Sequence, residues 1–538
     1  MNDTLTPFHS FAFDEVSQLD QDVSIALANI REWRNSFIRI NRLPLDILSL
    51  IPTHLPSQKD HLRASFVCRH WRMTLLQRAE LWSKLFLSKG DVYVETFLQR
   101  AKGSALDIII ARGVSMWTMA LLSSDIGRMR SLDFSCVSWT DLLDFSLVNI
   151  GPLPRLRALT IDTRDLDVFG FNPPTPPPQP LFNNAVNVRE LCLRSRSQQC
   201  SPSFACFNFP NLVSFEFLTV QSERFRASQL LDFLEASPAL RTVDMTILGR
   251  ILFDGVPRER VVTLPNVENF NLIMSDGGPG YKIAAHISCP SARSTSLTHE
   301  GADRSMVPEE IFPSSGSWNA IVRQYSRSPV EEVAFELEIS LVVSCELAFR
   351  SADGTHIKLC FKAFDKDNDG YFPPSPEMQN EVLTQATNTV QNHPLANIKR
   401  LWVCHAFRFV FSPEESRVEG EIRRLLKSVS PLDELTISRC HLRPYHFSLF
   451  NLQEGNTEEP AVLPRIKKLT ISHPKYTTDY DFKVAIVGMA ERQHALGVPF
   501  EHVVIRGENM PAGVREGLRP WVGNVEHCYD KPRESNDD

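Results

Sequence analysis

Short strand-like phrases recur along the chain after residue 100, and this recurrence constrains the fold more than any other feature of the sequence. Six of these phrases follow one another at an average spacing of about 28 residues: MRSLDF at Met129, LRALTI at Leu156, VRELCL at Val188, LVSFEF at Leu212, LRTVDM at Leu240 and VENFNL at Val267. Four more phrases follow at a spacing of about 34 residues: KRLWV near Leu401, DELTI near Leu435, KKLTI near Leu469 and EHVVI near Val503. Such regularity predicts structural repeats.

Amphipathic stretches of helical length lie between these phrases, for example at residues 228–235, 381–391, 421–428 and 484–496. A unit of one strand and one helix cannot bury its apolar face alone, so neighbouring units must stack. The residues therefore predict an α/β solenoid over residues 100–525. An unrelated α/β domain, with strands and helices alternating around an open sheet, is the alternative.

Three segments interrupt the predicted repeats. The proline-rich FNPPTPPPQP at 171–180 is expected to be an exposed polyproline-like spacer, with an SH3 or WW ligand as the alternative. Residues 275–317 are rich in Gly, Ser and Pro and predict a loose insertion. The third insertion lies near 365–377. The polar tail at 526–538 is expected to be disordered.

The third insertion begins like a calcium-binding EF-hand loop, with DKDNDGY from Asp365 to Tyr371. Its twelfth position, which needs a bidentate carboxylate, is Pro376, and the preceding IKLCFKAF predicts a strand instead of a helix. We therefore expect an acidic turn. The GGPG segment from Gly277 to Gly280 has no following helix, so it predicts a turn and not a nucleotide loop.

Composition excludes several classes of function. The 538 residues are 43% hydrophobic and 22% charged, and the net charge of −7 gives no general attraction to nucleic acid or acidic membranes. The polar, acidic N-terminus contains no apolar run long enough for a signal peptide or a membrane span. The eleven cysteines include no CxxC pair, which favours reduced, mostly buried thiols. A cytoplasmic or nuclear location is expected.

No catalytic or metal-binding pattern appears with the context that its chemistry requires. GxSxG, HExxH and paired-carboxylate arrangements are not found, so an enzyme is not expected and no cofactor or metal is implied. His405, His441 and His446 fall at strand ends and loops without ligand spacing. The basic residues near the N-terminus lack an aromatic platform, so they predict a solvated face and not a nucleic-acid site. They are Arg63, Arg69, Arg72, Arg78 and Lys84.

The run from Leu43 to Trp82 holds many large apolar residues in about forty positions and predicts three short helices. The first begins at Pro44 and ends before Pro52. Ser57 and Asp60 have the spacing of a capping box and open the second helix, and the third follows. So short a unit cannot bury so many apolar side chains internally, which indicates a partner. A self-contained helical hairpin is the alternative.

The same run contains, in order, Leu43-Pro44, Asp46-Ile47-Leu48, Val67-Cys68-Arg69, Trp71-Arg72 and Leu81-Trp82. This order resembles the F-box, the small helical domain that docks a substrate receptor onto the Skp adaptor of a cullin-RING ubiquitin ligase. Leu45, where many members are polar, and the close spacing of Pro52 and Pro56 depart from the pattern. Neither departure removes an anchor. The resemblance covers under a tenth of the chain.

The resemblance implies helix-in-groove binding, in which a few desolvated apolar anchors carry most of the binding energy. Cys68 is then a small buried hydrophobe and not a nucleophile. We expect Phe66, Leu75 and Trp82 to hold the three helices together. The adaptor-binding residues that the resemblance implies are Leu43, Pro44, Leu45, Ile47, Leu48, Ile51, Leu55, Leu62, Val67, Cys68, Trp71, Leu75 and Trp82.

The resemblance also implies a function: a non-catalytic substrate-receptor subunit of an SCF-type ubiquitin ligase. The repeats look like degenerate leucine-rich repeats, lacking the Asn or Cys that usually ends each strand turn, and they would capture a protein target that the sequence does not identify. The ubiquitin-transferring enzyme that the ligase recruits would then react faster with the target only because the two are held close together. A solenoid scaffold outside any ligase, capped by the helical unit, is the alternative.

The expected fold class is therefore α+β, with a three-helix F-box at 41–88 followed by the α/β leucine-rich-repeat-like solenoid. Residues 1–40 form a polar lead and an amphipathic helix over 11–40. Its apolar residues recur at spacings near three and four, and they are Val16, Leu19, Val23, Leu27, Ile30 and Trp33. We expect this helix to pack back on the following unit, because the pattern is brief for the alternative, a coiled coil with another chain.

Overall fold

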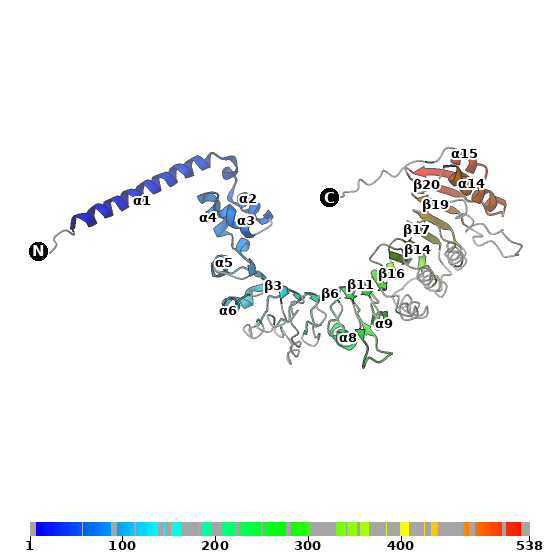
Figure 1. The fold of residues 1–538 in the computed structure, drawn as a ribbon, viewed down its shortest axis with the longest axis horizontal. Helices are drawn as coiled ribbons and strands as arrows, with labels where there is room; N and C mark the ends of the chain where they lie inside the picture. Colours follow the sequence, from blue (N-terminus) through cyan, green and yellow to red (C-terminus); the bar gives the residue numbers. More distant parts are fainter. Residues whose placement is uncertain are drawn as a thin grey trace. The chain divides into compact units, whose positions relative to one another are not determined.

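The structure is a computed structural model of the whole chain. It describes residues 7–55, 58–87, 94–111, 114–137, 142, 145, 152–163, 182, 185–195, 204, 207–220, 225–248, 251–275, 281–301, 330–339, 342–351, 356–364, 384, 399–407, 424, 432–438, 466–472, 479–495, 497–507, 510 and 513–528. The chain divides into two compact units, Met1–Ile161 and Asp162–Asp538. Mixed helix and strand content is confirmed: a helical N-terminal region is followed by a large, mainly parallel sheet (Figure 1).

The first unit begins with helices. They are α1 (Pro7–Ser36), η1 (Arg39–Arg42), α2 (Leu45–Leu50), η2 (Ile51–His54), α3 (Gln58–Ser65), α4 (Arg69–Gln77) and η3 (Ala79–Trp82). The three predicted short helices are confirmed as α2, α3 and α4. Pro44 precedes the first of them as its extended N-cap, and Pro52 lies in the 3-10 turn that follows it. Ser57, the expected capping residue of α3, lies outside the described residues.

The apolar side of helix α1 does not pack back on the helices that follow it, contrary to expectation, and only polar contacts near the end of α1 reach them. Val16, Leu19, Ile30 and Trp33 are each 60% or more exposed. Figure 1 shows α1 as one long, uninterrupted helix. The apolar pattern predicted the helix correctly but did not identify what its apolar side contacts.

Three parallel strands follow in the first unit, β1 (Lys84–Leu87), β2 (Leu106–Ala111) and β3 (Met129–Val137), accompanied by α5 (Val94–Ala101), α6 (Met116–Ser123) and η4 (Ile126–Arg128). Trp82, with a fully buried ring, packs edge-to-face on Phe97 of α5 with ring centroids 5.1 Å apart. Its indole N–H donates to the Leu75 carbonyl over 2.9 Å. Trp82 therefore joins α4 to the layer that supports the first strands. Strand β4 (Ala158–Thr163) spans the boundary between the units.

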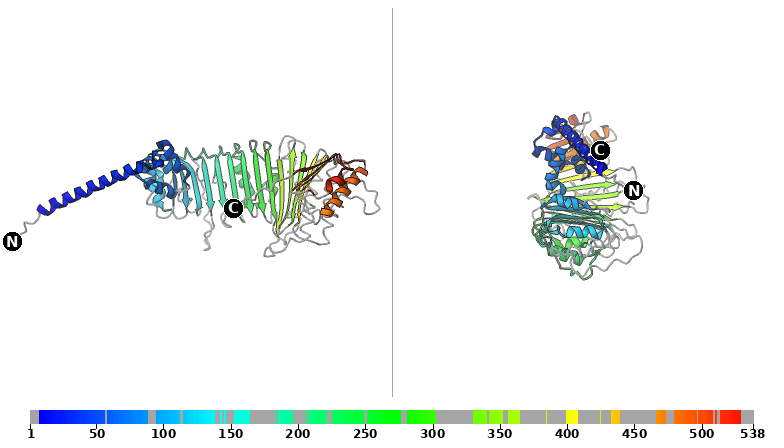
Figure 2. Two further views of the ribbon diagram at one scale, coloured as in Figure 1. Left: turned by 90° about the horizontal axis from the view of Figure 1, so that it is seen from above. Right: turned by 90° about the vertical axis from the view of Figure 1, so that its left-hand side faces the viewer.

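The second unit begins with parallel strands that pair in the order of the sequence and lie side by side (Figure 2). They are β5 (Glu190–Ser195), β6 (Ser214–Val220), β8 (Thr242–Leu248), β11 (Asn269–Ser275) and β13 (Ser294–Gly301). Helices α8 (Ala227–Glu235) and α9 (Tyr281–Ala285) lie on one side of this row (Figure 1). The short parallel pairs β7 (Phe225–Arg226) with β9 (Ile251–Leu252) and β10 (Val262–Thr263) with β12 (Ile287–Ser288) complete the region.

These strands are buried on one face. In β8, for example, Val243, Met245 and Ile247 are buried, and the residues between them are half-buried or exposed. The alternation is that of a strand with one apolar face and one face in solvent. Phe204, Phe215, Phe217 and Phe233 form an aromatic cluster on the buried side.

An antiparallel insertion interrupts the sequential order. The strands β14 (Val330–Ile339), β15 (Val342–Ser351) and β16 (His356–Phe364) pair antiparallel to one another. Strand β16 lies beside β13, whereas β14 lies beside β17 (Arg400–Phe407), both in parallel register. The chain therefore enters and leaves this insertion without breaking the sheet. The repeat pattern in the sequence did not predict this reversal.

The remaining strands are again parallel and sequential: β17, β18 (Glu434–Ser438), β19 (Lys468–Ser472), β20 (His502–Arg506) and β21 (Asn524–Cys528), with helices α14 (Asp479–Ala495) and α15 (Val514–Leu518). Every strand phrase identified in the sequence is a strand. The helices predicted at 228–235 and 484–496 are confirmed as α8 and α14, with shifted ends.

Some expected segment boundaries are wrong. Residues 275–317, expected to be a loose insertion, contain α9, β12 and the long strand β13, in which Thr295, Leu297 and Thr298 are buried. Helix α9 begins directly after the GGPG segment, where the sequence predicted no helix. The expected tail from residue 526 begins inside β21. The segments at 171–180 and 365–377, the predicted helices at 381–391 and 421–428, and residues 529–538 lie outside the described part of the chain, apart from the single residue 384 in the first of these helices and 424 in the second.

Candidate functional site

The helices at residues 40–88 are held by polar contacts as well as by a small core. The side-chain oxygen of Asn41 accepts the Trp71 indole N–H over 2.8 Å, and its amide donates to the Asn35 carbonyl over 2.8 Å. His61 contributes a ring nitrogen 2.8 Å from the Pro52 carbonyl. These contacts fix both α1 and the turn after α2 relative to α3 and α4.

Four of the predicted adaptor-binding residues lie in the interior of the helical domain. Leu48 is 1% exposed, Trp71 7%, Leu75 2% and Trp82 0%. Side chains this buried pack against the domain's own helices, so they hold the site's shape. The half-buried members of the predicted set are Leu43, Ile51, Leu55, Leu62 and Cys68.

A second set of apolar residues in the same helices faces solvent. Leu45, Ile47 and Leu50 of α2 are 54%, 43% and 54% exposed, and Pro44 beside them is also exposed. Phe66 and Val67, in the turn between α3 and α4, are 70% and 62% exposed, and Met73 of α4 is 50% exposed. We call Leu45, Ile47, Leu50, Phe66, Val67 and Met73 the exposed apolar set. Several large exposed apolar side chains within so short a segment are typical of an interaction surface.

The prediction that Phe66 belongs to the internal core is wrong. It assumed that α3 continues through residue 67, which would place Phe66 on the same helical face as Leu62. The helix ends at Ser65, and Phe66 and Val67 donate their backbone N–H groups to the carbonyls of Arg63 and Ala64 in a turn. Their side chains therefore point away from the helix's buried face. Leu50, Phe66 and Met73 were absent from the predicted site, and only exact helix ends would have identified them.

The comparison with known families concerns this same region. Residues 40–88 match the family model described as F-box-like. The F-box-like domain that the sequence indicated is thereby shown at the domain level. F-box domains generally bind Skp adaptors, and the match suggests a role in an SCF-type ligase. A search of curated proteins finds no match to the chain.

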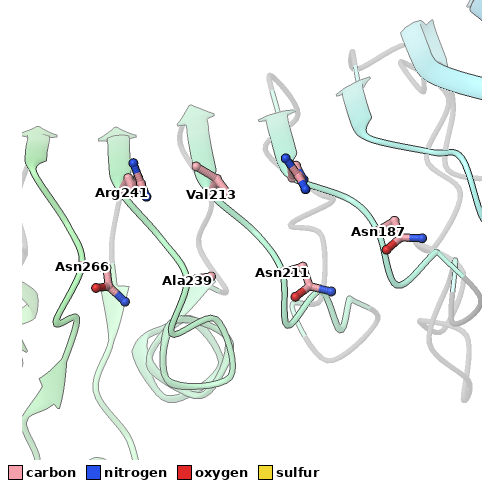
Figure 3. Close-up of a pocket in the computed structure, with 7 residues that line it drawn as sticks. Asn187, Asn211, Val213, Ala239, Arg241 and Asn266 are labelled. Atoms are coloured by element: carbon pink, nitrogen blue, oxygen red, sulfur yellow. The ribbon is translucent and has the colours of Figure 1, made fainter.

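A second candidate site is a hollow of about 510 Å³ in the second unit, where the chain enters successive strands. Figure 3 shows its lining residues in equivalent positions of neighbouring strands, with Asn187, Asn211, Ala239 and Asn266 in the turns. The Asn211 amide donates to the Val186 carbonyl and the Asn266 amide to the Pro238 carbonyl, each over 3.0 Å. These asparagines therefore tie each turn to the one before it.

Two exposed arginines stand at the strand starts in this hollow. Arg189 precedes β5 and Arg241 precedes β8, with Val213 in the equivalent position before β6 between them. Arg241 lies 3.9 Å from Glu268, an ion pair on an exposed surface and therefore a weak one. Planar guanidinium groups bind carboxylates and other oxyanions in bidentate fashion, so this rim has the chemistry to bind oxyanions.

The solvent face of the strands is polar and internally paired. Arg194 of β5 donates two hydrogen bonds to Glu216 of β6, at 3.0 and 2.8 Å, and this contact raises the pKa of Arg194. Asn271 of β11 donates to Asp244 of β8 over 2.9 Å. Further along, Trp402 of β17 is 41% exposed on the strand. Exposed tryptophans are among the side chains that dominate protein interfaces.

Other groups considered in the sequence contribute no chemistry here. Burial raises the pKa of the Cys289 thiol far above its ordinary value, so this thiol is inert. In the part of the chain that the structure describes, no three His, Cys, Asp or Glu side chains are arranged to hold a metal ion. Within the same residues, no helix combines the length and apolar character needed to cross a bilayer. The acidic loop at 365–371 and His441 and His446 lie outside the described residues.

Proposed function

We propose that the protein is a substrate-receptor subunit of an SCF-type cullin-RING ubiquitin ligase. The F-box-like domain binds the Skp adaptor, and the second unit binds the target protein. The observation that carries this proposal is the exposed apolar set within residues 40–88, because those residues match the F-box-like model and their side chains face solvent. The protein acts without catalytic residues of its own, in the cytoplasm or nucleus.

The exposed apolar set supports a division of labour within the helical domain. Leu45, Ile47 and Leu50 are offered by α2, whereas Leu48 between them is buried and holds the helix in place. Desolvating an exposed anchor at an interface contributes about 1–3 kcal/mol, so three or four of them suffice for stable docking. We therefore assign adaptor binding to the exposed members and structural support to Leu48, Trp71, Leu75 and Trp82.

The second unit supplies the target-binding surface in this proposal. We propose that it is a degenerate leucine-rich-repeat-like solenoid, which is supported by sequential parallel strands with one buried face and by α8 on one side of the row. Its polar solvent face, the arginine rim and the exposed Trp402 are the groups available to a partner. Protein targets with an acidic segment fit the rim best.

Binding of the purified full chain to the purified Skp adaptor tests the proposal, measured by isothermal titration calorimetry. The variants Leu45→Lys and Ile47→Lys are expected to weaken binding at least tenfold each, because a charged group then enters an apolar contact. Both side chains are exposed, so folding is preserved. The matched control is Val261→Lys, which changes an equally exposed residue outside the domain and is expected to bind normally.

An intact chain that does not bind the adaptor would overturn the ligase proposal and favour a solenoid scaffold that acts outside any ligase. Equal weakening by Val261→Lys would instead show that the adaptor recognises another surface. Circular dichroism of every variant confirms that the fold is unchanged. The simpler double variant Leu43→Ala with Pro44→Ala tests the start of α2 in the same assay.

A further inference from the structure

Helix α1 presents an apolar seam that the described chain leaves uncovered. Val16, Leu19, Val23, Ala26, Ile30 and Trp33 follow one another at alternating spacings of three and four residues. That spacing is the a and d pattern of a heptad repeat and places all six on one side of the helix. Val16, Leu19, Ile30 and Trp33 are 60–67% exposed and Val23 is 49% exposed. We call these six residues the α1 seam.

The contact between α1 and the F-box-like helices uses a different side of the helix. Glu32 pairs with Arg69 of α4 over 3.3 Å, and Glu32 stands two positions after Ile30, outside the seam. The Asn41 amide contacts only the last turn, at the Asn35 carbonyl. These contacts hold the end of α1 in place and leave the α1 seam uncovered.

Charge along α1 is divided between its halves. Asp14, Glu15, Asp20 and Asp22 all precede Val23, whereas Arg31, Glu32 and Arg34 stand near the end, where Glu32 is paired with Arg69. Two copies lying antiparallel bring the acidic stretch of each toward Arg31 and Arg34 of the other. Two copies lying parallel bring like charges together. The helix is thus complementary to itself in one orientation only.

We propose that α1 pairs with α1 of a second copy of this chain as a short antiparallel coiled coil. The register follows from the charges that flank the seam: Val23 packs against the second copy's Trp33, and Ala26 packs against its Ile30. Val16 and Leu19 then lie opposite positions beyond Ser36, where the partner helix ends. Each layer then combines a smaller residue with a larger one. In this register Asp20, which flanks the seam, faces Arg34 of the second copy, and Leu27 faces its own equivalent.

The parallel arrangement is unfavourable for the same residues. In a parallel pair, Asp20 of each copy faces Glu15 of the other, so two carboxylates meet on each side of the seam. Antiparallel pairing replaces these contacts by two Asp20–Arg34 pairs. Opposite charges beside a heptad seam determine the orientation of the partner, even where each pair contributes little energy.

The length of the seam sets the strength of the association. Short helices associate only when their apolar faces are covered, and the paired stretch from Val23 to Trp33, about a heptad and a half, gives a small interface. We expect a dimer with a dissociation constant in about the micromolar range. Each dimer carries two F-box-like domains. Self-association does not depend on adaptor binding, so either proposal can fail without the other.

The mass of the full chain measured by sedimentation equilibrium over a range of concentrations tests the pairing. A dimer that forms as the concentration rises is expected. Val23→Asp places a charge in the seam and is expected to give a monomer, whereas Gln21→Asp, on the opposite side of the helix, is expected to dimerise normally. A monomeric intact chain at about 100 μM would overturn the proposal.

Charge exchange distinguishes the two orientations. Asp20→Arg is expected to weaken an antiparallel dimer about tenfold, because the introduced guanidinium group then faces that of Arg34 at both ends. Arg34→Asp should weaken it similarly, and the double exchange should restore it. In a parallel dimer Asp20→Arg would instead strengthen the association, because the new positive charge faces Glu15. That outcome would overturn the antiparallel assignment.

Cross-linking tests the register. The variant Leu27→Cys is expected to form an interchain disulfide under mild oxidation, because the two residues at this position face one another in the proposed register. Ala28→Cys is the matched control, since the next position points away from the partner. Peptide mapping separates these disulfides from those of the native cysteines. Equal cross-linking by both variants, or by neither, contradicts the register.

Discussion

The indole N–H of Trp71 donates to the side-chain oxygen of Asn41 over 2.8 Å, and this contact links the F-box-like helices to the segment that follows α1. Asn41 also donates to the Asn35 carbonyl over 2.8 Å, so one amide satisfies groups from two helices. Trp71 is 7% exposed, so its indole N–H would be left buried without an acceptor if Asn41 were lost, which lowers the stability of the domain. The position of α1 relative to α4 therefore depends on one half-buried side chain.

The first prediction concerns this amide. Asn41→Leu is expected to destabilise the helical domain by about 1–3 kcal/mol, because the buried indole N–H loses its partner. Hydrogen exchange measured by mass spectrometry should show faster exchange in α3 and α4. The control Asn35→Ala removes a side chain but keeps the carbonyl that Asn41 contacts, so exchange should stay unchanged. Equal effects of both variants would contradict this role of Asn41.

The second prediction concerns thiol reactivity. Cys289 is 1% exposed and burial raises its pKa, whereas Cys192 is half-buried on the solvent face of β5. Iodoacetamide should label Cys192 at least tenfold faster in the native protein, with site-resolved mass spectrometry as the measurement. The contribution of the neutral Cys289 thiol to stability is present below its ordinary pKa of about 8.5 and is lost progressively as pH rises above it. Rapid native labelling of Cys289 would contradict the described packing.

The sequence predicted local structure well where apolar residues alternate or recur. Every strand phrase became a strand, because residues such as Leu191 and Leu193 alternate with polar residues that face solvent. The segment IKLCFKAF was correctly expected to be a strand, β16, but the antiparallel pairing of β14, β15 and β16 was missed, because alternation does not determine strand direction. Strand direction is a property of the tertiary structure that local periodicity does not contain.

The candidate site was predicted at the level of the domain and less well at the level of residues. The order of anchors located the F-box-like helices, since Leu48 and Trp82 stand at the expected places. It did not separate side chains that build the domain from side chains that face outward, because both are large and apolar. Phe66 shows the reason: one residue beyond the end of α3, the helical period no longer determines the direction of the side chain.

The third prediction concerns acid. The Cys528 thiol, which is 3.2 Å from the Glu526 carboxylate, and His502, 3.1 Å from it, lower the pKa of Glu526. A carboxyl group whose pKa is lower in the folded state stabilises β21 when the pH is above its ordinary pKa of about 4.3. This stabilisation is lost as the pH falls below that value. Hydrogen exchange in β21 should therefore increase between about pH 4 and pH 3, relative to β19. The variant Glu526→Gln should abolish this pH dependence, and a dependence that survives it would contradict the assignment.

The fourth prediction adds a contact that one turn between strands lacks. Asn211 and Asn266 each donate to a carbonyl of the preceding turn over 3.0 Å, whereas Ala239 occupies the equivalent position between them. Ala239→Asn should supply the missing hydrogen bond to the Pro210 carbonyl and stabilise the second unit by about 0.5–1 kcal/mol.

Asn211→Ala and Asn266→Ala should each destabilise that unit by a similar amount, and thermal unfolding followed by circular dichroism provides the measurement. The hollow beside Ala239 leaves room for the larger side chain, so a steric cost is not expected. Ala239→Gln is the matched control, because its longer side chain carries the same amide but displaces it from the carbonyl. If Ala239→Gln stabilised the unit as much as Ala239→Asn, added polarity and not the specific hydrogen bond would be responsible. The turns would then be held by their backbone contacts alone, such as the 2.8 Å bond from the Arg241 N–H to the Val213 carbonyl.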